Sequence, residues 1–312
     1  MGYAENHLCL SLGAVTERPF WMGQMTDLSA QKRARVTLKL LRQKKLQKSR
    51  ITAIGVYDAP MAAIADRVGF DLLVVGNAGP MSLLAHAAPT TVTFEVQLFL
   101  TRAVSRVAKY GLIVGHLPFM SYHASKEQAI TSATRMVRDG GAHAVKCEGN
   151  AYTAQYLAEI VRAGIPVMGH IGLQASRRVE QSGFGVKGRS ADEAYGIVQT
   201  ARAFVEAGIF AFILEQVPTE LAAYLTRTLP VPVITLGAGP VNDGVYHIGG
   251  DLVGYSAFPL PKGRGAYANV GADIEAALIR FKDDCVNHRY PVDEQSTHIA
   301  PEEWALLAQK LG

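Results

Sequence analysis

Charged and imidazole side chains follow several apolar stretches of this 312-residue chain. Lys146 and Glu148 lie two residues apart in one such stretch, so in a strand both point to the same face. An ammonium and a carboxylate placed together could hold an anionic substrate and a cation, or they could form a structural ion pair. Glu215 ends another apolar stretch, where burial raises the pKa of a carboxyl group and suits it to act as a general base near neutral pH. A buried, hydrogen-bonded glutamate is the alternative.

Other polar residues end apolar stretches in the same way. Tyr57, Asn77, His116 and His170 each occupy such a position. Each of the two histidines could be a ligand or a hydrogen-bonded core residue. Because most of the stretches end in this way, we expect these side chains to converge on one site.

The stretches themselves predict the fold. Short β-branched runs alternate with helical segments, and the expected strands span residues 51–58, 71–78, 111–118, 143–148, 166–173, 209–217, 232–239 and 251–256. Continuous apolar strands are typical of parallel sheets buried on both faces. Eight βα units in about 230 residues predict an α/β fold of the (β/α)8 TIM-barrel type, whose active sites lie at the C-terminal ends of the strands. An open, doubly wound sheet is the alternative.

The motifs at these strand ends resemble the ketopantoate (3-methyl-2-oxobutanoate) hydroxymethyltransferase family, a phosphoenolpyruvate mutase and isocitrate lyase type of barrel. The similarity covers residues 36–298. The matching stretches include L-P-F-M-S-Y at 117–122, V-K-C-E-G at 145–149, G-H-I-G-L at 169–173, L-E-Q-V-P at 214–218 and G-A-G at 237–239.

The resemblance implies a cytoplasmic enzyme of pantothenate synthesis. It would transfer a hydroxymethyl group from 5,10-methylenetetrahydrofolate to C3 of a 2-oxo acid, through an enolate stabilised by a divalent metal, Mg²⁺ in the family. Lys146 would bind the substrate carboxylate, Glu148 would face the metal, and Glu215 would be the base, with His170 in the same pocket. Tyr57, Asn77 and Ala78 would complete the substrate site. The family also implies a homo-oligomer, often a decamer.

The chain departs from the family pattern at the metal site. The family motif V-G-D-S reads V-G-N-A at 75–78, and the aspartate before L-P-F-M is His116. Mg²⁺ prefers hard oxygen ligands, so the set Asn77, His116 and Glu148 suits a softer ion such as Zn, Fe or Ni, or no metal. Three hypotheses follow: a hydroxymethyltransferase, a diverged barrel enzyme such as a C–C lyase acting on a related acid, and a non-catalytic binding protein.

Charge is concentrated in one segment. Residues 31–50 hold nine of the 31 basic residues and no acidic one, so the rest of the chain carries 22 basic against 27 acidic residues. No aromatic residues interleave with these charges, which favours an amphipathic helix that flanks the barrel over a nucleic-acid site.

Composition sets the remaining expectations. With 49% hydrophobic and 19% charged residues, the chain can bury a large core. It has no apolar run long enough to span a membrane and no signal-peptide pattern, and its three scattered cysteines favour a reducing, cytoplasmic setting. We expect an N-terminal extension over residues 1–30, a barrel with its leading basic helix over 31–290, and a C-terminal tail and helix over 291–312.

Overall fold

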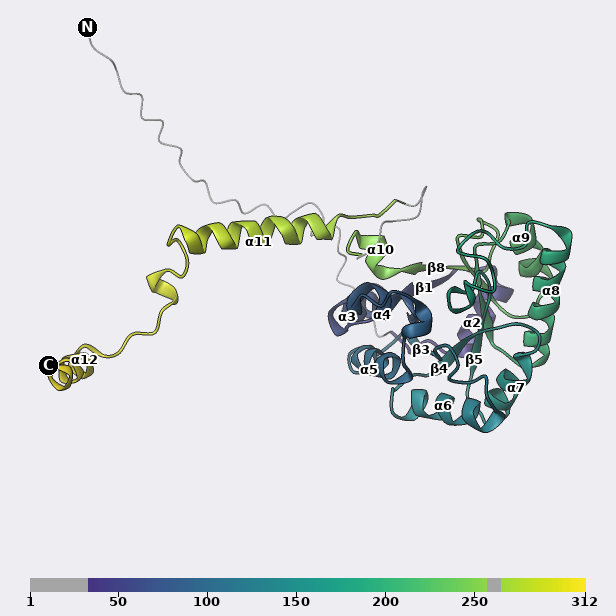
Figure 1. The fold of residues 1–312 in the computed structure, drawn as a ribbon, viewed down its shortest axis with the longest axis horizontal. Coiled ribbons are helices and arrows are strands. Elements are labelled where there is room, and N and C mark those ends of the chain that lie inside the picture. The colour runs from purple at the N-terminus through teal and green to yellow at the C-terminus, as the bar shows by residue number, and fades with distance from the viewer. Residues whose placement is uncertain (1–32, 257–264) are drawn as a thin grey trace, which may run out of the picture. The chain divides into compact units, whose positions relative to one another are not determined.

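The computed structural model describes residues 33–256 and 265–312 and contains the predicted (β/α)8 barrel (Figure 1). Eight parallel strands pair in chain order, and β8 pairs with β1 to close the sheet. The strands are β1 (Ile51–Gly55), β2 (Leu72–Val75), β3 (Leu112–His116), β4 (Ala144–Glu148), β5 (Val167–Gly172), β6 (Ala211–Glu215), β7 (Val233–Leu236) and β8 (Gly244–Ile248). The open-sheet alternative is therefore excluded.

Helices α3 to α9 connect the strands and cover the barrel, α2 precedes β1, and α10 to α12 follow β8. The helices are α2 (Leu38–Leu46), α3 (Ala59–Val68), α4 (Ala78–Leu84), α5 (Phe94–Ser105), α6 (Lys126–Arg138), α7 (Ala154–Arg162), α8 (Ala191–Glu206), α9 (Thr219–Thr228), α10 (Gly249–Val253), α11 (Val270–Val286) and α12 (Pro301–Leu311). Short 3-10 turns span Pro89–Thr91, Ala175–Arg177 and Asp293–Gln295. Among the helices that the structure describes, none combines the length and apolar content that a membrane crossing requires.

The alternation of side chains along the strands separates the core from the site. Inward-facing residues of the lower barrel form one apolar cluster, which includes Leu112, Ala144, Met168 and Ile213. The next inward positions toward the C-terminal ends are polar, and they hold His116, Lys146, His170 and Glu215. Outward-facing residues pack against the helices in a second cluster. The polar strand ends thus form the top layer of the barrel interior.

The basic segment closes the opposite end of the barrel. Leu41 of α2 is buried in the same cluster as the inward strand residues. Lys44 Nζ lies 2.7 Å from Asp71 Oδ1, and Lys45 Nζ lies 2.7 Å from Asp243 Oδ2. Both aspartates precede strands, so these lysines bind the N-terminal ends of β2 and β8. This use of the charges supports the prediction of a helix that flanks the barrel.

The prediction of the eighth strand is wrong. We expected it at residues 251–256, but β8 spans Gly244–Ile248, and Asp251 lies in α10. The true strand has only three non-glycine apolar or aromatic residues, one of which, Val245, is half exposed. Leu252 packs against the core from the short helix α10, and the apolar pair Leu252–Val253 therefore resembled part of a buried strand in the sequence.

The expected chain divisions stay predictions. The extension at 1–30 lies outside the described residues. At the other end, α11 and α12 have no buried residue in the described chain.

Candidate functional site

A cavity of about 460 Å³ lies at the C-terminal ends of the strands. Its lining includes six of the residues singled out from the sequence: Asn77, Ala78, Lys146, Glu148, His170 and Glu215. These residues come from β4, β5, β6 and the loop and helix after β2. The fold therefore brings most of the predicted site together, whereas Tyr57 and His116 do not line this cavity.

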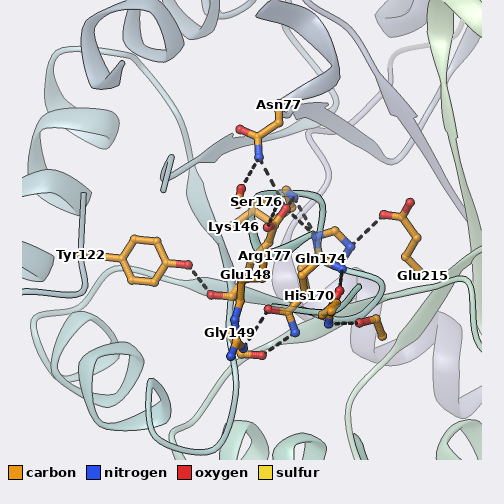
Figure 2. Close-up of polar contacts among 12 residues, drawn as sticks. Asn77, Tyr122, Lys146, Glu148, Gly149, His170, Gln174, Ser176, Arg177 and Glu215 are labelled. Carbon is orange, nitrogen blue, oxygen red and sulfur yellow. Dashed lines mark hydrogen bonds and ion pairs between the residues drawn. The ribbon is translucent and has the colours of Figure 1, made fainter. Parts of the chain in front are cut away.

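Four of these side chains form a connected network (Figure 2). Lys146 Nζ lies 3.1 Å from His170 Nδ1 and 3.9 Å from Glu148 Oε1. His170 Nδ1 lies 3.3 Å from Glu148 Oε1, and its Nε2 lies 3.0 Å from Glu215 Oε2. The imidazole thus joins two carboxylates that line the cavity, of which Glu148 is 5% exposed and Glu215 is 18% exposed.

The network holds Glu148 ionised. Burial raises the pKa of this carboxyl group, but the hydrogen bond and charge of His170 and the charge of Lys146 reverse the shift and leave it well below the usual range. For His170, burial and Lys146 lower the pKa, and the hydrogen bonds to Glu148 and Glu215 raise it to a net value above its usual one. Burial lowers the pKa of Lys146, and both carboxylates oppose that shift. The site therefore favours a protonated imidazole between two anionic groups.

Glu215 differs from the other members in its exposure. Its side chain is 18% exposed, against 5% for His170, and it lines the cavity. A carboxylate that faces a cavity and is oriented by an imidazole can accept a proton from a bound molecule.

Asn77 is oriented by its neighbours. Its amide nitrogen donates to Ser176 Oγ at 3.0 Å and lies 3.5 Å from Glu148 Oε1, which leaves Oδ1 buried without a hydrogen-bond partner in the described chain. The Ser176 backbone N–H donates to Glu148 Oε2 at 3.1 Å. Both oxygens of Glu148 therefore already receive N–H groups.

His116 is the second position where the family carries an aspartate. It is buried, and neither ring nitrogen has a hydrogen-bond partner among the described residues. Burial and the charge of Lys146 lower its pKa well below the usual value, so the ring is neutral. It lines a separate small pocket that it shares with Glu148.

These residues do not fit Mg²⁺. The three candidate ligands are a neutral amide oxygen, a neutral imidazole and one carboxylate that is already hydrogen bonded at both oxygens, whereas Mg²⁺ requires near-octahedral coordination by hard oxygen atoms. Within residues 33–256 and 265–312, no group of three or more His, Cys, Asp or Glu side chains is arranged to hold a metal ion.

Two residues that hold the backbone at Glu148 and Gly149 were not predicted from the sequence. Tyr122 Oη donates to the Glu148 carbonyl, and Gln174 Nε2 donates to the Gly149 carbonyl at 2.7 Å (Figure 2). These bonds fix the end of β4, which carries Lys146 and Glu148. Tyr122 was within a matched motif, but its type did not distinguish it from a core aromatic residue.

Tyr246 was missed as well. It faces inward from β8 and lines the cavity. Because the eighth strand was predicted at residues 251–256, Tyr246 was not expected to lie in a strand. Tyr57, which we expected to bind substrate, is buried outside the cavity lining, and burial and neighbouring Tyr246 raise its pKa.

Comparisons with known proteins identify the family of this chain. The family model described as ketopantoate hydroxymethyltransferase matches residues 35–293. A 3-methyl-2-oxobutanoate hydroxymethyltransferase of Moorella thermoacetica is 42% identical over 267 residues, which cover 85% of this chain and 98% of the relative. One from Nitrosopumilus maritimus is 37% identical over 265 residues, covering 85% and 95%.

Solved structures show the same barrel at low sequence identity. Phosphonopyruvate hydrolase in complex with oxalate and Mg²⁺ is 13% identical with a TM-score of 0.53, over 88% of this chain and 96% of that one. For 2,3-dimethylmalate lyase, a member of the phosphoenolpyruvate mutase and isocitrate lyase superfamily, the identity is 16% and the TM-score 0.52, over 88% and 99%. These likenesses show the fold alone. Because both the family model and the curated relatives cover the whole barrel, the chain belongs to the ketopantoate hydroxymethyltransferase family.

Proposed function

We propose that this enzyme transfers a hydroxymethyl group to C3 of a branched 2-oxo acid, with 3-methyl-2-oxobutanoate as the substrate. One observation carries the proposal. The cavity-facing carboxylate of Glu215 is oriented by His170, and the buried ammonium group of Lys146 lies on the other side of that ring. A base and a cation around one cavity are what enolisation of an anionic 2-oxo acid requires.

The first step is a proton transfer. Lys146 holds an oxygen of the substrate, and Glu215 removes the C3 proton. The electron pair of the C3–H bond forms the C2–C3 double bond, and the carbonyl electron pair moves to the C2 oxygen. Glu215 becomes neutral as the enolate forms, so the total charge of the site does not change.

The second step forms the C–C bond. We propose 5,10-methylenetetrahydrofolate as the donor of the one-carbon unit. Water adds to the methylene carbon as its two bonds to the folate nitrogens break, the two protons of the water pass to those nitrogens, and the carbon is released as formaldehyde. The enolate C3 then attacks the formaldehyde carbon, and the resulting alkoxide takes the proton that Glu215 removed. A cavity of about 460 Å³ is larger than an eight-heavy-atom acid needs, which leaves room for part of a second reactant.

Self-association is part of the proposal. Leu278, Ile279 and Phe281 of α11 are all more than half exposed in the described chain. Exposed apolar residues on one helix are typical of interaction surfaces. Light scattering on the eluted peak of a gel filtration column gives the mass, and a monomer at working concentration would contradict this part.

The test of the function is deuterium exchange at C3 of 3-methyl-2-oxobutanoate in D₂O, followed by proton NMR, and then ketopantoate formation after the folate is added. We expect exchange by the wild-type enzyme, and a loss of about 10²–10⁴-fold in Glu215→Gln. Glu220→Gln changes an exposed glutamate of α9 and serves as the matched control. If no branched 2-oxo acid exchanges, with or without added Mg²⁺, Zn²⁺, Fe²⁺ or Ni²⁺, the proposed function is wrong.

Exchange without product formation would support the alternative of a diverged enzyme. A panel of 2-hydroxy and 2-oxo diacids then tests for C–C cleavage, because a lyase forms the same enolate in the reverse direction.

A further inference from the structure

Tyr246 brings a phenol hydroxyl to the cavity that Lys146 also lines. Its Cα pairs with that of Ala53 on β1, so its ring rises from the middle of the barrel into the top layer. A Cβ added to Gly76 would lie 3.7 Å from Tyr246 Oη and 3.9 Å from Lys146 Cε. The hydroxyl and the lysine side chain therefore both border the space above the backbone of Gly76, and both residues line the cavity.

Gly55 leaves the space that the hydroxyl occupies. A Cβ on Gly55 would lie 2.7 Å from Tyr246 Oη, which is too close for an unshifted contact. The absence of a side chain at Gly55 thus leaves room for the phenol hydroxyl, and Tyr246 and Lys146 both line the cavity. Burial raises the pKa of Tyr246, so its hydroxyl stays protonated and can donate at neutral pH.

The charges of the four-residue network balance. Glu148 and Glu215 are carboxylates, and Lys146 and protonated His170 are cations, while Asp251 adds a further carboxylate to the cavity lining. When Glu215 accepts the C3 proton, its negative charge moves to the C2 oxygen of the substrate. Hydrogen-bond donors already in place at that oxygen stabilise such a charge without reorganisation.

We propose that Tyr246 and Lys146 together bind the oxygens of the 2-oxo acid, and that this donor pair, in place of a divalent cation, stabilises the enolate. The inference rests on the proposed function and adds to it a further catalytic residue and the source of the stabilising charge. It agrees with the poor fit of Asn77, His116 and Glu148 to Mg²⁺, because a site that supplies its own donors does not need the Lewis acid.

The experiment begins with full-length enzyme treated with a chelator and then dialysed, with its metal content measured by elemental analysis. Binding of 3-methyl-2-oxobutanoate is measured by calorimetry, and C3 exchange by NMR. We expect both to stay within twofold of the untreated enzyme, and neither to rise more than twofold when Mg²⁺, Zn²⁺, Fe²⁺ or Ni²⁺ is added.

The second arm tests Tyr246 itself. In Tyr246→Phe, which keeps the ring, we expect exchange to fall about 10²–10³-fold, the loss typical for one donor to an oxyanion. Tyr195→Phe alters a 63% exposed tyrosine of α8 and is the matched control. Thermal unfolding and substrate binding are measured on each variant, because a merely misfolded protein loses both together with the exchange.

Each result decides the question. Exchange that is lost on chelation and restored by one ion overturns the inference, leaves the proposed function intact and assigns Asn77, His116 and Glu148 to that ion. Exchange by Tyr246→Phe at the wild-type rate also overturns it. Absence of exchange under every condition overturns the proposed function, and the inference with it. The chelation arm needs no variant, so it decides even if Tyr246→Phe does not fold.

Discussion

His170 Nε2 lies 3.0 Å from Glu215 Oε2, across the neighbouring strands β5 and β6. The contact holds because the ring itself is fixed at its other nitrogen, which lies 3.3 Å from Glu148 Oε1. Glu148 in turn receives the Ser176 backbone N–H. The orientation of the proposed base therefore depends on a chain of contacts that ends in the backbone.

This relationship predicts the effect of removing the imidazole. In His170→Asn, Glu215 keeps its charge but loses its orienting partner, and we expect C3 exchange to fall about 100-fold, as small misplacements of reacting groups do. KM should change less than kcat, because Lys146 remains. Steady-state kinetics measure the split. His298→Asn, in an exposed position near the C-terminus, is the control. Equal losses in both variants would contradict the role of His170.

The raised pKa of His170 also predicts how stability depends on pH. A group whose pKa is higher in the folded than in the unfolded state stabilises the fold fully below its unfolded pKa, about 6.5 for histidine, and loses that contribution as pH rises through the folded value. We expect the melting temperature of the wild type to fall more between pH 6 and pH 9 than that of His170→Gln. Calorimetric scans at several pH values measure the difference. Parallel profiles for the two proteins would show that His170 does not titrate in this way.

Much of the site could be predicted because a parallel strand buried on both faces leaves few reasons for a charged residue. Lys146 and Glu215 interrupt apolar runs, and the structure places both at the cavity. Tyr57 also ends such a run, but it follows β1 and lies outside the cavity lining. Position at a strand end was therefore informative, whereas the direction of the side chain depended on the register of the strand.

Other features of the site had no recognisable pattern in the sequence. Tyr246 lies in a short strand with a half-exposed valine, a pattern that differs little from a loop. Asn77 and His116 were found at strand ends, and the resemblance identified them as replacements of metal ligands. Whether their neutral groups take a metal depends on atoms that other strands bring near. The hydrogen bonds that occupy both oxygens of Glu148 come from distant segments of the chain, and no local pattern indicates them.

The lysines of α2 are expected to stabilise the fold at the end of the barrel opposite the candidate site. Lys45 and Asp243 form a 2.7 Å pair with side-chain exposures of 14% and 12%, and the same Asp243 oxygen accepts the Val233 backbone N–H at 2.9 Å. Lys45→Met leaves this carboxylate without its cation and should destabilise the fold by about 1–3 kcal/mol, less than the loss for a fully buried pair. Urea denaturation measures it.

The matched control is Arg138→Met. Arg138 pairs with Asp139 in an exposed position, and pairs of that kind contribute little. Equal stability of Lys45→Met and wild type would contradict a structural role for the basic segment and reopen the nucleic-acid alternative, which binding to a DNA duplex at low salt then tests.

A substitution at Gly55 is expected to affect both the stability of the barrel and the binding of substrate. A methyl group there would collide with the hydroxyls of both Tyr57 and Tyr246. Gly55→Ala should therefore cost about 1–3 kcal/mol of stability, as overpacking does, and should weaken binding of the 2-oxo acid because Tyr246 is displaced. Adding Tyr246→Phe removes one of the two colliding oxygens, so the double variant should be more stable than Gly55→Ala alone.

Gly196→Ala is the matched control. It lies on an exposed face of α8 with nothing within 4 Å of the added group, so it should be as stable as the wild type or more so. Denaturation of the four proteins side by side measures the coupling, and strictly additive losses would show that the glycine and the tyrosine do not share this space.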